Sequence, residues 1–303
     1  MTETTLPRPA DKLAAVFWGL PRWFGLPAVA LMVTLGGLIA GASVPQMVLA
    51  NIAAALLMAY AHTWNSFHDW ASGLDQGPPE ERSRPKPYTS GQNLIARGVV
   101  SQSQTLVVAL GYLGFSAVIT GFLAVETTPW VWLPWAVAVP CAPLYSWGKF
   151  WYGCEFFLTV GFGPAAAMLG AASAPGADLW RAALASLPMG ILFGYGAEVV
   201  DQYIDSGPNV PKGLRNIGAL CWKYDISLIW PLTFILLLVA LSQGLLLAFD
   251  VLVSPTVYAL AWLFPIWLLI PHMEKGSTKA IMTSLALVFL YGLTLVVLQG
   301  VYG

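Results

Sequence analysis

The chain has 303 residues, of which 57% are apolar and only 10% are charged, and its formal net charge is −1. Its mean hydropathy is +0.69. A composition this apolar excludes an ordinary water-soluble domain and is typical of an integral membrane protein. We expect no nucleic-acid binding, because no basic stripe exists away from the acidic clusters described below.

Stretches of roughly 20 apolar residues, the length that crosses about 30 Å of hydrocarbon, recur along the whole chain. They predict one all-α domain over residues 1–303, a polytopic bundle of nine transmembrane helices. The N-terminal segment is polar, and we expect no cleavable signal peptide. The nine expected helices cover about residues 24–42, 46–68, 102–124, 129–147, 155–175, 180–200, 226–247, 250–270 and 279–300.

The basic residues predict how the bundle is oriented. With a cytoplasmic N-terminus and alternating helices, 13 of the 14 Lys and Arg residues fall inside and only Arg181 falls outside. This asymmetry follows the positive-inside rule. We therefore expect a multi-pass protein of the cell (inner) membrane, surrounded by lipid, with its N-terminus and the loops 69–100 and 201–225 in the cytoplasm.

The first acidic cluster closes the second expected helix. Asn65 and Asp69 are four residues apart and face the same side of a helix. Gly73 can end that helix, so that Asp75 folds back toward the other two. A carboxylate beside a bilayer is costly without a neutralising partner, so such residues are candidates for a functional site.

The second acidic cluster closes the sixth expected helix. Asp201 and Asp205 repeat the four-residue spacing, and Glu198 lies one turn earlier on the same face. Side-chain oxygens in this pattern suit Mg²⁺, which takes one or two carboxylates together with phosphate oxygens and water. The expected metal ligands are Asn65, Asp69, Asp75, Glu198, Asp201 and Asp205.

Basic residues accompany both clusters. Arg84 and Lys86 follow the first cluster, and Lys212 and Arg215 follow the second. Arg and Lys bind phosphate oxygens, so these four residues are candidates for diphosphate binding, although basic loops also fix membrane orientation. At the end of the fourth expected helix, Tyr145-Ser-Trp-Gly-Lys149 places a tyrosine and a lysine on one face, which marks a further candidate pair.

These motifs resemble those of the UbiA superfamily of intramembrane prenyltransferases, and the resemblance extends over most of the chain. The shared features are nine helices, aspartate motifs on helices two and six, and Tyr-x3-Lys on helix four. The usual first motif is Asn-x3-Asp-x3-Asp. Here Gly73 takes the last position and the next acid is Asp75, a variant similar to the dihydroxynaphthoate prenyltransferases of menaquinone synthesis.

The second motif departs from that branch. The dihydroxynaphthoate enzymes usually have Asn-x2-Asp with an Arg just before the Asp, whereas this chain has Glu198 and Val200. The resemblance therefore implies ionisation of a prenyl diphosphate more strongly than it implies a naphthoate acceptor.

The resemblance implies that Mg²⁺ ions on the two acidic clusters hold the diphosphate of an allylic prenyl substrate. Lys149, Lys212, Arg215, Arg22 and Arg84 would neutralise the leaving group, and an aromatic acceptor would attack the allylic cation. Asp69, Asp201, Tyr145 and Lys149 are then the expected catalytic residues.

Two other functions remain compatible with the sequence. A terpene cyclase of the UbiA type would ionise the same substrate and need no acceptor. A transporter would need charged groups along the helices as well as at one end, and the acidic clusters lie at the inner rim alone.

Overall fold

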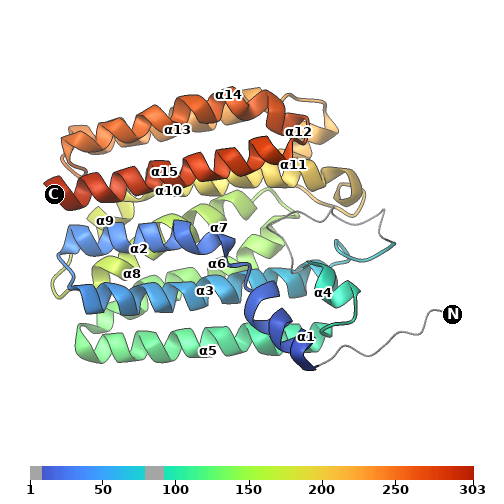
Figure 1. Cartoon of the computed structure of the whole chain (residues 1–303), viewed down its shortest axis with the longest axis horizontal. Coiled ribbons are helices and arrows are strands. Elements are labelled where there is room, and N and C mark those ends of the chain that lie inside the picture. The colour runs from blue at the N-terminus through green and yellow to red at the C-terminus, as the bar shows by residue number, and fades with distance from the viewer. Residues whose placement is uncertain (1–8, 79–91) are drawn as a thin grey trace.

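The computed structural model of the protein describes residues 9–78 and 92–303, and within these two ranges helices are the only regular secondary structure. Arg84 and Lys86, two of the expected diphosphate-binding residues, lie outside the described residues. The helices lie side by side in one bundle whose long axis is horizontal in Figure 1.

The long helices of the bundle cross it from one end to the other. They are α2 (Leu26–Ala40), α3 (Val44–Ala71), α5 (Gln102–Glu126), α6 (Trp132–Gly148), α13 (Ile229–Ala248), α15 (Thr278–Tyr302) and, together with the 3₁₀ segment before it, α14 (Leu263–Glu274). Three short helices lie at the end of the bundle shown on the right in Figure 1: α1 (Pro9–Ala14), α4 (Gln92–Ala96) and α12 (Ile217–Lys223).

Two of the crossings are irregular. One consists of α7 (Cys154–Val160), a π-helical segment at Gly161–Ala165 and α8 (Ala166–Ala172). The other consists of α9 (Leu179–Ala185), α10 (Leu187–Ile191), a π-helical segment at Leu192–Ala197 and α11 (Glu198–Asn209). A further π-helical segment follows α1 at Ala15–Gly19, and 3₁₀ segments lie at Trp23–Gly25, Pro129–Val131 and Ser254–Trp262. Since π-helical turns are frequent at functional sites, the two irregular crossings are candidates to contribute to one.

By length and composition, seven helices of the described chain can cross a membrane. The segments Leu179–Ala185 and Leu187–Asn209 are bent by 47° at their junction, and if this pair forms one span the number is eight. The fourth expected helix is present as α6, which has only 17 residues. A helix of about 20 residues is needed to span the hydrocarbon unaided. The protein is therefore an all-helical, multi-pass membrane protein, and the predicted count of nine is not confirmed.

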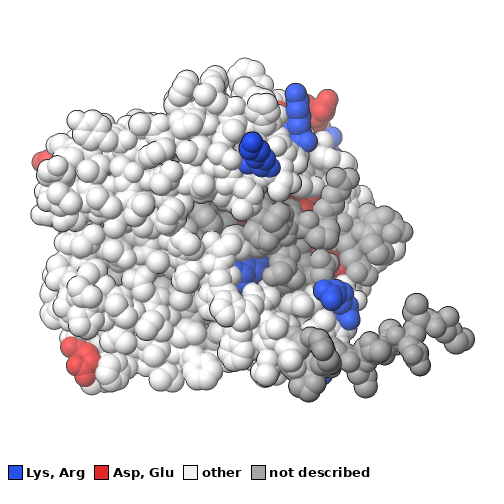
Figure 2. Space-filling model, viewed as in Figure 1, with Lys and Arg blue, Asp and Glu red and all other residues white. Residues whose placement is uncertain are grey.

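Charged side chains gather at one end of the bundle. Figure 2 shows the Lys and Arg residues of the visible face in its right-hand half, while the left-hand part is uncharged except for acidic side chains at its far edge. The ends of α3, α6 and α11 meet at this charged end, because contacts described below join their side chains. The fold thus brings the two acidic clusters together.

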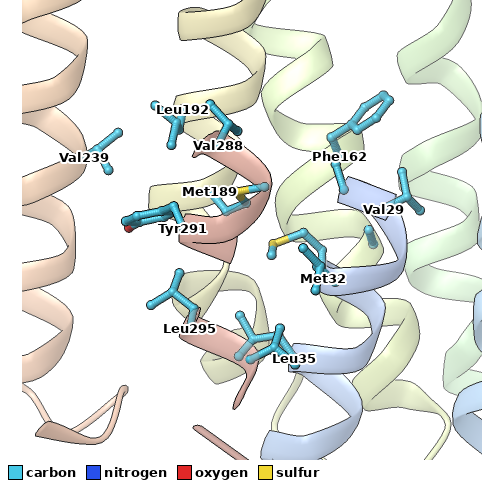
Figure 3. Close-up of a cluster of buried hydrophobic side chains, with 14 of the residues drawn as sticks. Val29, Met32, Leu35, Phe162, Met189, Leu192, Val239, Val288, Tyr291 and Leu295 are labelled. Atoms are coloured by element: carbon cyan, nitrogen blue, oxygen red, sulfur yellow. The ribbon is translucent and has the colours of Figure 1, made fainter. Parts of the chain in front are cut away.

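The uncharged part of the bundle has a closely packed core (Figure 3). Met32 and Leu35 of α2, Met189 of α10, and Tyr291 and Leu295 of α15 belong to one buried apolar cluster. This packing gives the membrane-embedded half of the molecule a fixed shape that can support a site at its end.

The helices α2 and α8 touch backbone to backbone. A Cβ atom at Gly36 would overlap the carbonyl oxygen of Ala167, and one at Gly170 would overlap that of Val33. Small residues at such contacts let membrane helices approach closely.

Candidate active site

The first acidic cluster is buried at the end of α3. Asn65, Asp69 and Asp75 expose 5%, 2% and 4% of their surfaces, so water cannot freely solvate the amide of Asn65 or the two carboxylates. The helix ends at Ala71, and Gly73 follows with a φ angle of +86°. The amide of Asp75 then donates to the carbonyl oxygen of Asp69 at 3.1 Å. The predicted return of Asp75 toward the other two residues is therefore observed.

Lys149, just beyond the last residue of α6, neutralises this cluster. Its Nζ lies 2.9 and 2.8 Å from the two carboxylate oxygens of Asp69 and 2.8 Å from Oδ1 of Asn65. The Asn65 amide also donates to Asp69 at 2.9 Å, and Ser146 donates to Asn65 at 3.3 Å. The ion pair is buried on both sides, so its geometry is held by several hydrogen bonds within the protein.

The second cluster begins with a separate hydrogen-bond network. Tyr145 donates to Oε1 of Glu198 at 2.6 Å, and Gln202 donates to the same oxygen at 2.6 Å. Asn216 donates to Gln202 at 3.2 Å and accepts from the amide of Ala219 at the start of α12 at 2.8 Å. Glu198 is thus bound to α6 and, through Gln202, to the loop before α12.

Asp201 and Asp205 follow Glu198 along α11. Asp201 is half-buried and lines the cavity described below, and Asp205 is 4% exposed. The three acids share one face of the helix, since residues three and four apart are neighbours. Glu198 and Asp201 line the cavity, and the role of the three acids as metal ligands stays a prediction.

Arg22 and Lys212 both donate hydrogen bonds to the first acidic helix or to the loop that follows it. Arg22, in a left-handed conformation before α2, is buried and donates to Ser66 of α3 at 3.0 Å. Lys212 donates to the carbonyl oxygens of Leu74 and Gln76 at 2.9 and 2.7 Å, one on each side of Asp75. This lysine ties the second acidic loop to the first.

Arg215 contributes through its backbone. Its amide donates to the carbonyl oxygen of Lys149 at 2.6 Å, and its own carbonyl accepts from the amide of Tyr152 at 3.0 Å. The side chain of Arg215 is exposed. The loop after α11 is therefore fixed against the end of α6 while the guanidinium stays in contact with solvent.

A cavity of about 190 Å³ opens at this charged end and continues between apolar helices. Its polar end includes Arg22, Asn65, Tyr145, Glu198 and Asp201. Its apolar walls come from α2, α8, α13, α14 and α15, and include Val29, Leu169, Leu236, Ile266, Leu285 and Val288. Phe162 and Phe193, stacked with ring centroids 4.9 Å apart, line it from the two π-helical segments. Such a cavity suits a ligand with a charged head and an apolar tail.

The oxygen atoms of the site are of the kind that a hard cation prefers. Oδ2 of Asp75 is buried and has no hydrogen-bond partner among the described residues, an arrangement that a bound cation would satisfy. Burial, together with the neighbouring carboxylate of Asp69, raises the pKa of Asp75 to about 7. Among the described residues, no three His, Cys, Asp or Glu side chains converge enough to hold a metal by themselves. A Mg²⁺ ion that draws one or two ligands from the protein and the rest from phosphate and water still fits.

Several site residues were not predicted from the sequence. Ser66 and Ser146 bind Arg22 and Asn65, and Gln202 links Glu198 to Asn216. The available signal was positional: Ser66 and Ser146 adjoin predicted site residues, and Gln202 lies one turn after Glu198.

Comparison with known proteins finds likeness at the level of structure. No protein-family model matches the chain, and no curated protein matches it either. A UbiA homologue from Archaeoglobus fulgidus bound to GPP and Mg²⁺ aligns with a TM-score of 0.63 at 16% identity, over 93% of this chain and 99% of that one.

Two further solved structures are similar. A digeranylgeranylglyceryl phosphate synthase aligns with a TM-score of 0.61 at 15% identity, over 96% of this chain and 99% of that one. An apo UbiA homologue from Aeropyrum pernix K1 gives 0.63 at 14% identity, over 90% and 97%. The chain therefore has the fold of the UbiA homologues, as the motifs predicted, while its similarity to the dihydroxynaphthoate branch stays a prediction.

Proposed function

We propose that this protein is a prenyltransferase that ionises an allylic prenyl diphosphate and transfers the prenyl group to an aromatic acceptor. The observation that carries the proposal is the cavity, which has Asn65, Asp201 and Arg22 at its charged end and apolar walls beyond. A diphosphate fits the charged end and an isoprenoid tail fits the walls. The fold supports the same function, since a neighbour of that fold binds GPP and Mg²⁺.

The residues of the chain divide the work by position. Asn65, Asp69 and Asp75 on one side, and Asp201 and Asp205 on the other, would hold Mg²⁺, which neutralises charge on the diphosphate as it leaves. Arg22 lies at the same end and would bind the phosphate oxygens, as would Arg84, Lys86 and Arg215 from the loops. Lys149 would join them where Mg²⁺ replaces it as the partner of Asp69, and Lys212 would hold the loop that carries Asp75. The apolar walls exclude water from the allylic cation, so that the acceptor captures it.

We further propose that the chain crosses a cell (inner) membrane nine times, with both acidic clusters on the cytoplasmic side. Helix α1 lies at the charged end of the bundle and the C-terminal end of α15 at the opposite end (Figure 1). An odd number of crossings is needed for that arrangement, and α6 together with the bent pair brings the seven candidate spans to nine. A reporter that is active only outside the cytoplasm should work when fused after Gly303 and stay silent when inserted at Gly77.

The test of the activity is a Mg²⁺-dependent assay with detergent-purified protein and geranylgeranyl diphosphate, its products identified by mass spectrometry. Substrate consumed only when a hydroxynaphthoate or hydroxybenzoate is added, and not by Asp69→Asn or Asp201→Asn, supports transfer. A cyclic terpene formed without acceptor would replace transfer by cyclisation. Consumption that persists in both variants would refute the metal site.

A further inference from the structure

Glu198 occupies a position that differs from that of the other acids. It lies at the start of α11, directly after the π-helical segment Leu192–Ala197, and lines the cavity where the wall turns apolar. The side chain is 8% exposed. A carboxylate in such surroundings is costly, which marks Glu198 as a candidate functional group of the cavity.

The hydrogen bonds of Glu198 use only one of its two oxygens. Tyr145 and Gln202 both donate to Oε1, each at 2.6 Å. Among the described residues no hydrogen bond reaches Oε2, and this atom is not among the buried atoms that lack a partner. The two donors therefore hold the carboxylate through Oε1, and Glu198 itself lines the cavity.

The position of Glu198 along its helix places it deeper than the expected diphosphate site. On α11 it precedes Asp201 by three residues, about 4.5 Å along the axis, and on α6 its partner Tyr145 precedes Lys149 by four residues, about 6 Å. Both helices run toward the charged end. A diphosphate held at the level of Lys149 directs the allylic carbon toward the level of Tyr145 and Glu198.

We propose that Glu198 is the catalytic base that accepts the proton released when the prenyl group joins the acceptor, a role that rests on the proposed function. The allylic C–O bond breaks and its electron pair leaves with the diphosphate. A ring carbon of the aromatic acceptor then forms a C–C bond to the allylic carbon. The proton on that ring carbon passes to Oε2 of Glu198 while the C–H electron pair restores the aromatic ring. Glu198 then gives this proton to the departing diphosphate, which returns its side chain to the carboxylate form.

The surroundings of Glu198 include titratable groups from three helices. The charged and titratable groups near Glu198 are Tyr145 and Lys149 from the α6 side, Asp201 on its own helix, and Cys154 and Glu155 of α7. Tyr145 and Gln202 act as positioning residues, because their hydrogen bonds keep the carboxylate turned toward the cavity.

The experiment compares the wild-type protein with Glu198→Gln, Glu198→Asp and Glu155→Gln in detergent, with MgCl₂, geranylgeranyl diphosphate and 1,4-dihydroxy-2-naphthoate. Glu155 is the matched control, since it is a glutamate that is only 1% exposed. It accepts a hydrogen bond from the amide of Ile217 and does not line the cavity. Binding is measured as the rise in unfolding temperature caused by Mg²⁺ with prenyl diphosphate, and turnover as kcat and KM for product.

Glu198→Gln is expected to keep the wild-type rise in unfolding temperature and KM while kcat falls about 10²- to 10⁴-fold, the range of general-base catalysis. Glu155→Gln should keep both. A wild-type kcat in Glu198→Gln overturns the proposal, and so does loss of the Mg²⁺-dependent rise, which would make Glu198 a metal ligand. If the Gln variant does not fold, Glu198→Asp decides: an unchanged KM with a reduced kcat supports the base, and a wild-type kcat refutes it.

Failure of the proposed function gives a different result. A wild-type protein that neither gains stability from prenyl diphosphate with Mg²⁺ nor consumes it overturns the transferase and the base together. Turnover by the wild-type protein, with equal turnover by Glu198→Gln, overturns only the role of Glu198.

Discussion

The substitution Lys149→Met tests whether the charged end of the bundle is built to receive a cation. In the structure the ammonium group donates to both oxygens of Asp69 and to Asn65 at 2.8–2.9 Å. The side chains of Lys149 and Asp69 are 5% and 3% exposed, so solvent screens the pair very little. Methionine keeps most of the apolar stem and removes the charge, which leaves the carboxylate of Asp69 buried without its partner.

Breaking a buried ion pair from one side costs about 3–5 kcal/mol. In a chain of this size that corresponds to a fall in unfolding temperature on the order of 10 °C. We expect the full loss in buffer with a chelator. Mg²⁺ should restore much of it, because the metal replaces the ammonium as the counter-charge of Asp69. The same ion should stabilise the wild-type protein less, since there it competes with Lys149 for the same oxygens.

Unfolding can be followed with a thiol-reactive dye, because Cys141, Cys154 and Cys221 are free and buried in the folded chain. Lys275→Met is the control: it removes an exposed lysine, and such a change shifts stability by about 0.5 kcal/mol or less. Wild-type stability of Lys149→Met in chelator would show that the ion pair contributes nothing. A Mg²⁺ effect no larger than that of the wild-type protein would show that Asp69 does not bind the metal.

Three further predictions follow from the packing and the acidic loop. Gly36→Ala should lower the free energy of unfolding by about 3 kcal/mol, because the added methyl group forces α2 away from α8. Gly111→Ala is the control: its added methyl group meets open space, so thermal unfolding should show no loss of stability. Asp75 titrates near pH 7 when folded and near 3.9 when unfolded, so the folded state holds its proton more tightly and the metal-free protein should lose stability as pH rises from about 4 to 7. Tryptophan fluorescence would show this slope and its absence in Asp75→Asn, and the gain in stability from Mg²⁺ should grow over the same interval because the metal needs the ionised carboxylate. Lys212→Met removes two hydrogen bonds to the backbone that flanks Asp75 and should weaken Mg²⁺ binding about tenfold. Lys212→Arg should recover part of the affinity, and an unchanged Mg²⁺ titration of Lys212→Met would refute this positioning role.

Local pattern was enough to predict much of the site. Helical spacing alone places Asn65 and Asp69 on one face, and Gly73 alone allows the chain to reverse before Asp75, because only glycine adopts a positive φ angle without strain. The same reasoning placed Tyr145 and Lys149 together on α6. These relations depend on residues within a turn or two of one another, so the sequence contains all the information that they need.

The contacts between distant segments could not be predicted in the same way. The prediction that Lys149 binds a diphosphate gave no sign that its ammonium group also holds Asp69 and Asn65, 80 and 84 residues away. Lys212 likewise binds carbonyl oxygens beside Asp75. Nothing in the local pattern distinguishes a lysine that binds phosphate from one that binds a neighbouring loop.

The membrane character of the chain, its helical class and the two acidic clusters were determined by the sequence itself, because hydrophobicity and helical periodicity act over short distances. The tertiary structure decided which atoms of those clusters meet. It directed Glu198 to Tyr145 and Gln202, and it aligned the charged mouth with an apolar cavity. Such pairings depend on how the helices cross and where their ends meet, and these are set by packing over the whole bundle.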